Sequence, residues 1–142
     1  MNRAQLVDFV RQRALAVVAT RGPDGAPQAA LVGVAATDRG ELVFDTAARS
    51  RKCANLRAFP RVAVVIGWDD EVTLQCEGDA EVVTGPERDR CLAAYVAQYP
   101  DGRERATDPD IVLVRVRLDW GRLSDYRLRS FGTDELEPGD NT

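Results

Sequence analysis

The 142-residue chain contains no histidine, and this absence excludes several classes of enzyme. Without an imidazole there is no Ser-His-Asp or Cys-His nucleophile system, no histidine-ligated metal and no histidine-bound haem. The remaining residues identify no catalytic acid or base and no metal site. If the chain carries out redox or transfer chemistry, we therefore expect a bound cofactor to supply it.

Other features are scarce. The three cysteines, Cys53, Cys76 and Cys91, are odd in number and widely spaced, which predicts reduced thiols and neither a disulfide framework nor a zinc site. No apolar run approaches the roughly 20 residues that cross a bilayer, and the charged N-terminal segment lacks an apolar signal core. We therefore expect a cytoplasmic protein with no membrane partner. The net charge of −4 also disfavours nucleic-acid binding, which depends on clustered positive charge.

What the sequence does contain is a succession of short strand-like segments. We expect strands at residues 15–20, 28–36, 41–46, 61–68, 72–82 and 111–118, with a further piece at 120–128. Residues 61–68 are almost continuously apolar, which predicts a strand covered on both faces. Helical patterns occupy residues 3–13 and 50–58 and follow residue 84. Strands at this spacing favour an antiparallel barrel over a βαβ sheet.

One domain accounts for the length of the chain. We expect it to extend over residues 1–131. The following segment, residues 132–142, is acidic and rich in turn-forming residues, so we expect a disordered tail there.

The most informative segment joins the third expected strand to the second expected helix. The only lysine of the chain, Lys52, stands beside Arg51 at the expected start of that helix, directly after Ser50, a good N-cap. A helix N-terminus carries partial positive charge, so each cation there is disfavoured by about 0.3–1 kcal/mol. A bound anion would reverse that penalty, because helix N–H groups, hydroxyls and cations would converge on it. We interpret the cluster as a phosphate site, and the alternative is that both cations are simply solvated.

The order of these elements resembles a known family. A strand, a Pro-Asp-Gly turn, two strands ending in Phe-Asp-Thr and then the motif SRKxxNLxxxPRV are similar to the pyridoxamine 5'-phosphate oxidase-like, FMN-binding split barrels. The resemblance covers Leu15 to Tyr126 and is most specific from Thr46 to Val62. It implies a mostly β fold with flanking helices, a six- to seven-stranded antiparallel Greek-key split barrel. It also implies bound FMN and a homodimer with the flavin at the interface.

The resemblance further implies which residues hold the flavin. Its phosphate would lie on the Arg-Lys pair and on hydroxyls near the preceding strand, its ring would border the second strand, and polar or aromatic groups would come from the fifth strand and from Trp120. Each of the ring contacts has a purely structural alternative. The second-strand residues would be an ordinary packed strand, the polar residues of the fifth strand a solvated barrel face, and Trp120 a core aromatic. The full expected set is Ala30, Leu31, Val32, Gly33, Asp45, Thr46, Ser50, Arg51, Lys52, Thr73, Gln75 and Trp120. Gly33, a glycine inside a strand, also fits a place where a flat group approaches the backbone closely.

The chain departs from the true vitamin B6 oxidases. They carry an arginine and a lysine on the second strand, where this chain has Ala30 and Ala35, and their C-terminal Arg-x-His element requires a histidine. We therefore do not expect oxidation of pyridoxamine phosphate. Three functions stay open: an FMN-dependent oxidoreductase acting on an unknown small molecule, a reductase that uses the deazaflavin F420, and a non-catalytic flavin-binding protein. A haem-degrading split barrel is disfavoured because its histidine ligand is missing.

Overall fold

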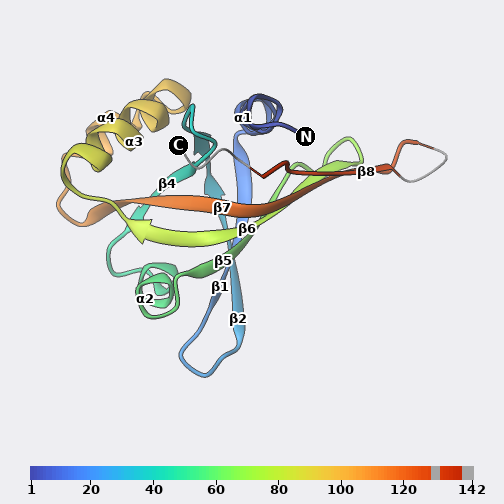
Figure 1. Cartoon of the computed structure of the whole chain (residues 1–142). Helices are drawn as coiled ribbons and strands as arrows, with labels where there is room; N and C mark the ends of the chain where they lie inside the picture. Colours follow the sequence, from blue (N-terminus) through green and yellow to red (C-terminus); the bar gives the residue numbers. More distant parts are fainter. Residues whose placement is uncertain (129–131, 139–142) are drawn as a thin grey trace.

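The computed structural model describes residues 1–128 and 132–138, which form a curved antiparallel sheet with helices around it (Figure 1). Along the chain the elements are α1 (Arg3–Arg13), β1 (Leu15–Arg21), β2 (Pro27–Gly33), β3 (Ala35–Ala36), β4 (Leu42–Ala47), α2 (Arg51–Ala58), β5 (Arg61–Ile66), β6 (Val72–Val82), α3 (Gly85–Gln98), α4 (Gly102–Arg105), β7 (Ile111–Asp125) and β8 (Gly132–Glu135). In these residues no helix is both long and apolar enough to span a membrane.

The barrel closes through one extended segment of chain. The strand order is β2-β1-β5-β6-β7-β4-β3, with β8 added beside β7. Because β2 pairs with β1 and β3 pairs with β4, residues 27–36 join the two ends of this order. Helix α2 then carries the chain from β4 to β5, which pairs on the other side of β1. The expected mostly β split barrel with flanking helices is confirmed.

The strand count differs from the expected six to seven for local reasons. Val34 separates β2 from β3, where one strand was expected. The two last expected segments form one long strand, β7, whose register with β6 shifts so that Asp119 bulges out between Leu118 and Trp120. With β8, the described sheet has eight strands.

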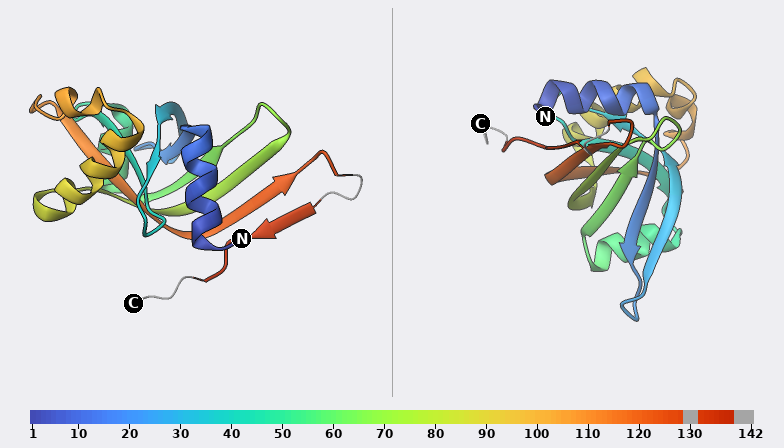
Figure 2. Two further views of the ribbon diagram at one scale, coloured as in Figure 1. Left: turned by 90° about the horizontal axis from the view of Figure 1, so that it is seen from above. Right: turned by 90° about the vertical axis from the view of Figure 1, so that its right-hand side faces the viewer.

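The C-terminal segment differs from the disorder that we expected for residues 132–142. Its first residues form β8, which pairs antiparallel with β7 (Figure 2). The N-terminal ammonium of Met1 donates to Asp134 Oδ1 at 2.7 Å. A strand edge offers unpaired backbone groups, and β8 supplies partners for those of β7. Residues 139–142 lie outside the described part of the chain.

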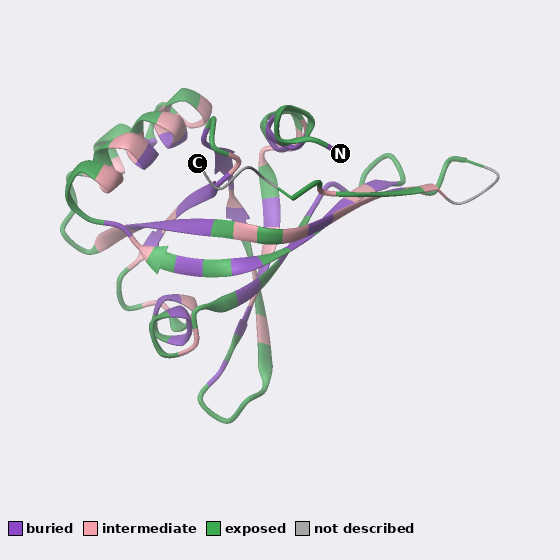
Figure 3. Ribbon diagram, in the orientation of Figure 1, coloured by how far each residue is buried: buried purple, intermediate pink, exposed green. Residues whose placement is uncertain are grey.

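The barrel interior follows the period-two pattern of the strands (Figure 3). On β6 the buried residues alternate with exposed ones, as expected for a strand with one apolar face. The strand expected at residues 61–68 is present as β5, but the expectation that both of its faces are covered was wrong for this chain. Val62, Val64 and Ile66 are buried, whereas Ala63 and Val65 are exposed on the opposite face of β5. A continuous apolar run therefore has only one of its faces covered within this chain.

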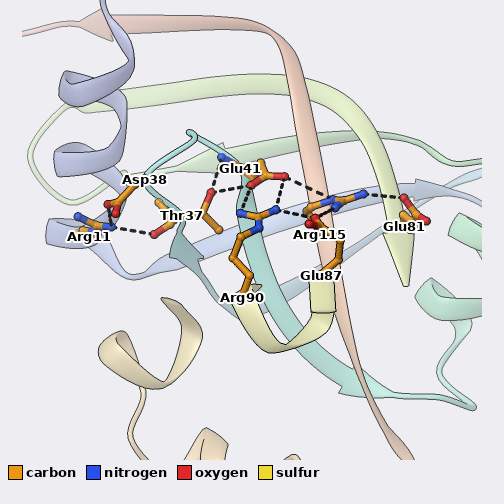
Figure 4. Close-up of polar contacts among 9 residues, drawn as sticks. Arg11, Thr37, Asp38, Glu41, Glu81, Glu87, Arg90 and Arg115 are labelled. Atoms are coloured by element: carbon orange, nitrogen blue, oxygen red, sulfur yellow. Dashed lines mark hydrogen bonds and ion pairs between the residues drawn. The ribbon is translucent and has the colours of Figure 1, made fainter. Parts of the chain in front are cut away.

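A network of polar and charged side chains, centred on the buried Glu41 and Arg115, fastens α3 to the barrel. Its members are Thr37, Glu41, Glu81, Glu87, Arg90 and Arg115 (Figure 4). The Arg115 side chain is only 3% exposed, and the Glu41 side chain 9%. Arg90 Nη1 donates to Glu41 Oε1 at 2.7 Å. Burial raises the pKa of Glu41, but the hydrogen bonds from Arg90 and Thr37 outweigh it and hold that pKa below its ordinary value.

We predict that Glu41→Gln lowers the free energy of unfolding by about 3 kcal/mol at pH 7, because the buried Arg115 and the partly buried Arg90 lose a carboxylate that both contact. The pKa of Glu41 is depressed in the folded state, so its contribution is present above the unfolded-state pKa of about 4.3 and is lost as pH falls below it. Urea denaturation across that pH range measures both effects. The exposed Glu104→Gln control should change stability by no more than about 0.5 kcal/mol, and an equally small effect of Glu41→Gln would contradict the prediction.

Candidate functional site

The start of α2 has the N-cap that its sequence predicts. Ser50 Oγ accepts a hydrogen bond from the Cys53 backbone N–H at 3.2 Å and lies 3.1 Å from Thr46 Oγ1 at the end of β4. The hydroxyls of the strand end and of the helix start therefore meet, as expected. The backbone N–H groups of Arg51 and Lys52, in the first helical turn, have no acceptor within the helix.

A surface pocket of about 170 Å³ opens between the first turn of α2 and the β1–β2 hairpin. Its lining consists of Val18, Thr20, Gln28, Ala29, Ala30, Arg51 and Lys52. Within residues 1–128 and 132–138, neither Arg51 nor Lys52 has a carboxylate partner, although eight other arginines do. The two cations that the sequence singled out are thus left available to a ligand.

Asn55 ties this helix to both strands of the hairpin. Its side chain is buried, and its Nδ2 donates to Thr20 Oγ1 at 3.0 Å and to Gln28 Oε1 at 2.9 Å. Sequence reasoning missed Thr20, Gln28 and Asn55 as site residues. The one available signal was the asparagine inside SRKxxNL, a polar residue next to the core residue Leu56.

The four expected ring contacts of the second strand do not face one ligand in this chain. Successive side chains of a strand point to opposite faces. Ala30 lines the pocket, Val32 is buried in the barrel core, and Leu31 is 63% exposed on the outer face. A flat ring does approach Gly33, but it belongs to Tyr99, whose Cζ would lie 2.8 Å from a Cβ at that position.

Asp45 points away from the start of α2. Its carboxylate accepts from the Tyr95 hydroxyl at 3.1 Å and from Arg105 Nε at 2.7 Å, beneath α3 and α4. Burial, and then the nearby Asp45 charge, raise the pKa of Tyr95 to about 12. The structure therefore corrects the placement of Asp45 in the phosphate cluster, because strand alternation sends it and Thr46 to opposite sides of β4.

Thr73, Gln75 and Trp120 also lie apart from the pocket. The first two stand on the outward-facing side of β6, which β5 separates from β1. Trp120 is half-buried on β7, with the Arg122 guanidinium 5.3 Å from its ring centroid. None of the three lines the pocket formed by this chain.

Ala35 is one of the two positions at which the resemblance implies a basic residue in the vitamin B6 oxidases. It is 1% exposed and belongs to a buried cluster with Val43, Cys91 and Tyr95 under α3. A charged side chain at that position would have to enter this apolar cluster, at the cost of an unpaired buried charge. In this chain the position is therefore part of the apolar packing under α3.

The sequence and the fold match known proteins. Residues 3–125 match the family described as pyridoxamine 5'-phosphate oxidase. A pyridoxine/pyridoxamine 5'-phosphate oxidase of Thermosynechococcus vestitus is 38% identical over 86 residues, 60% of this chain and 39% of that protein. The chain thus spans about two fifths of the length of this curated relative.

Solved structures share the fold at lower identity. A heme binding protein of Mycobacterium smegmatis superposes with a TM-score of 0.78 at 19% identity, covering 94% of this chain and 57% of the other. A pyridoxamine 5'-phosphate oxidase-related, FMN binding protein of Nostoc punctiforme superposes with a TM-score of 0.68 at 15% identity, covering 95% and 94%. At these identities the likeness shows a common architecture.

We predict that Gly33→Ala lowers the free energy of unfolding by about 1–3 kcal/mol, as overpacking does in cores. The added methyl group would overlap the Tyr99 ring, which stacks on Tyr95 and donates its hydroxyl hydrogen bond to the Ala14 carbonyl. Thermal and urea unfolding without added ligand measure the loss. In a Tyr99→Ala background the same substitution should cost much less. If Gly33→Ala were neutral in the ligand-free protein, the close approach of Tyr99 would not constrain this position.

Proposed function

The chain belongs to the pyridoxamine 5'-phosphate oxidase family, and on that premise we propose that it binds FMN and passes hydride or electrons through it to or from a small molecule. The observation that carries this proposal is the pocket at the start of α2, where Arg51 and Lys52 lack carboxylate partners in the described chain. A phosphate dianion bound there would turn the unfavourable placement of two cations at a helix N-terminus into a favourable one.

The residues present fit the phosphate end of FMN. Two cations, two unpaired N–H groups of the first helical turn and the nearby hydroxyls of Ser50 and Thr46 are all groups that bind phosphate oxygens. Pockets that enclose a whole ligand measure about 300–1,000 Å³, and this one measures about 170 Å³. It would therefore hold the phosphate end and leave the ring outside, near the small residues Ala29 and Ala30.

The protein supplies binding and orientation. When bound, the flavin provides the two-electron chemistry. Arg51 and Lys52 neutralise the phosphate, and Asn55 holds the hairpin wall against α2. No carboxylate, thiol or imidazole lines the pocket, and Lys52 is the one lining side chain that can exchange a proton near neutral pH. We do not propose haem binding, because the chain has no histidine to ligate the iron.

We further propose that the protein acts as a homodimer through the outer face of the sheet. Leu31, Val17 and Val65 are neighbours across β2, β1 and β5, and Leu31 and Val65 are 63% and 38% exposed. Such apolar rows are unusual on a surface that faces only water. Gln75 continues the row on β6. In a dimer, Gln75 and its outer-face neighbours Thr73 and Trp120 would lie close to the flavin bound by the partner subunit. They would then make the polar and aromatic contacts to the cofactor that the resemblance implies.

The location of the protein is also a proposal. The three cysteines are free and buried, and proteins of the cytoplasm keep such thiols reduced. We propose a cytoplasmic protein on this ground.

We predict that Arg51→Ala and Lys52→Ala each weaken FMN binding at least about tenfold, because a charge-assisted hydrogen bond to phosphate is lost. Neither substitution should lower the thermal stability of the ligand-free protein, since neither side chain is buried and each cation is slightly unfavourable at a helix N-terminus. Quenching of flavin fluorescence and the visible absorption spectrum measure binding. Arg57→Ala, in the last turn of the same helix and outside the pocket lining, is the matched control.

The outcomes of this titration separate the candidate functions. A wild-type protein that neither copurifies with FMN nor binds it on titration refutes FMN binding. Tighter binding of F420 in a parallel titration would assign the site to that deazaflavin. Bound FMN that no nicotinamide or other donor reduces in stopped-flow experiments would point to a non-catalytic flavin-binding protein.

We predict that Leu31→Glu converts the dimer into a monomer without loss of stability within the protomer. The side chain is already 63% exposed, so the change removes little packing but places two carboxylates against an apolar partner face. Light scattering after size-exclusion chromatography measures the mass. Asp24→Asn, in the exposed hairpin turn, should leave the mass unchanged. A wild-type protein that is monomeric at micromolar concentration would refute the proposed dimer.

A further inference from the structure

We propose that Asn55 is a positioning residue that sets the hydrogen-bonding polarity of the pocket, so that the wall formed by Thr20 and Gln28 offers donors and selects an anionic, acceptor-rich ligand. The inference rests on the proposed function only for the identity of that ligand. Asn55 itself lies behind the pocket wall and does not line it.

Both amide protons of the Asn55 side chain are used in hydrogen bonds to the pocket wall. The Asn55 side chain is buried in α2, and its Nδ2 donates one hydrogen bond to Thr20 Oγ1 at 3.0 Å and the other to Gln28 Oε1 at 2.9 Å. The two acceptors are cross-strand partners on β1 and β2. One amide group therefore determines which atoms of both neighbours are occupied.

Because Asn55 occupies an acceptor atom on each of Thr20 and Gln28, these two residues are left with hydrogen-bond donors for a ligand. When Gln28 Oε1 accepts from Asn55, the Nε2 of the same amide is left to donate to another partner; it lies on the hairpin-turn side of Gln28, 2.9 Å from where a Gly22 Cβ would be, and Gln28 is part of the pocket lining. When Thr20 Oγ1 accepts, its own hydroxyl proton is left for another partner. Arg51 and Lys52, which line the same pocket, can only donate. The polar groups of the lining thus share one polarity.

A reversed arrangement is the physical alternative. If the Asn55 amide turned over, its oxygen would accept from the Thr20 hydroxyl and from Gln28 Nε2. Gln28 would have to turn as well, because two amide oxygens would otherwise face each other without a proton between them. Gln28 Oε1 would then face the pocket and suit a ligand that carries donors. The orientation of one buried side chain therefore controls the preference of the site.

Asn55→Asp enforces the reversed arrangement with almost no change of shape, because a carboxylate can only accept. We expect the FMN dissociation constant to rise at least about tenfold, the scale of one lost hydrogen bond to a charged group. Ala54→Asp places the same charge on the exposed side of the same turn and should raise it less than about threefold. Gln28→Glu keeps an oxygen that accepts from Asn55 but removes the Nε2 donor, so it should weaken FMN binding as much as Asn55→Asp does. This second variant keeps the test decisive if Asn55→Asp folds poorly.

Side-chain amide NMR of the ¹⁵N-labelled protein gives the readout that a merely structural role would not move. In the free wild-type protein we expect the Asn55 amide protons to be protected from exchange and the Gln28 amide protons to exchange rapidly. The Gln28 signals should shift on addition of FMN, and in Asn55→Asp they should become protected. Protected Gln28 protons in the free wild-type protein, or unchanged FMN affinity in both Asn55→Asp and Gln28→Glu, would overturn the inference. A wild-type protein that binds no FMN refutes the proposed function instead, and the free-protein exchange data still decide the orientation of the two amides.

Discussion

The barrel depends on one constraint: a single extended segment must pair with two different strands. Residues 27–33 pair with β1, residues 35–36 pair with β4, and at the change of partner the Val34 N–H donates to the Ala14 carbonyl at 2.9 Å. Gly33 stands beside this change of partner, where the Tyr99 ring leaves no room for a side chain. Because this segment brings β1 and β4 into one barrel, the helix that follows β4 can pack against β1. The pocket is a consequence of that closure.

The same residue type serves two opposite purposes in this chain, and its surroundings decide which. Arg90 and Arg115 share carboxylates in a largely buried network, so their charges are compensated and they hold α3 in place. Arg51 stands at a helix start with no carboxylate partner in the described chain, next to Lys52. A compensated charge stabilises the fold, whereas an uncompensated one at a helix N-terminus offers a place for an anion. This contrast separates the cations that build the protein from those we propose to bind the cofactor.

The outer face of the sheet connects the candidate site to the proposed assembly. Ala29, which lines the pocket, and Leu31, which is strongly exposed, are two positions apart on the same strand, and Val65 continues the exposed apolar row on β5. A small pocket for the phosphate end and an adjoining apolar face fit a cofactor shared between two subunits. In the proposed dimer, Thr73, Gln75 and Trp120, which stand away from the pocket of their own chain, would belong to the site of the partner subunit.

The sequence by itself determined the features that depend on near neighbours. The alternation of residues 72–82, the N-cap at Ser50 and the two cations behind it are local patterns, and they predicted β6, the start of α2 and the core of the candidate site. Only the tertiary structure decided which distant groups meet. Asn55 bonds to Thr20 and Gln28, 35 and 27 residues away, Asp45 turns to α3, and Tyr99 fills the space beside Gly33. Which residues of different strands and helices face one another follows from barrel closure and not from local propensity.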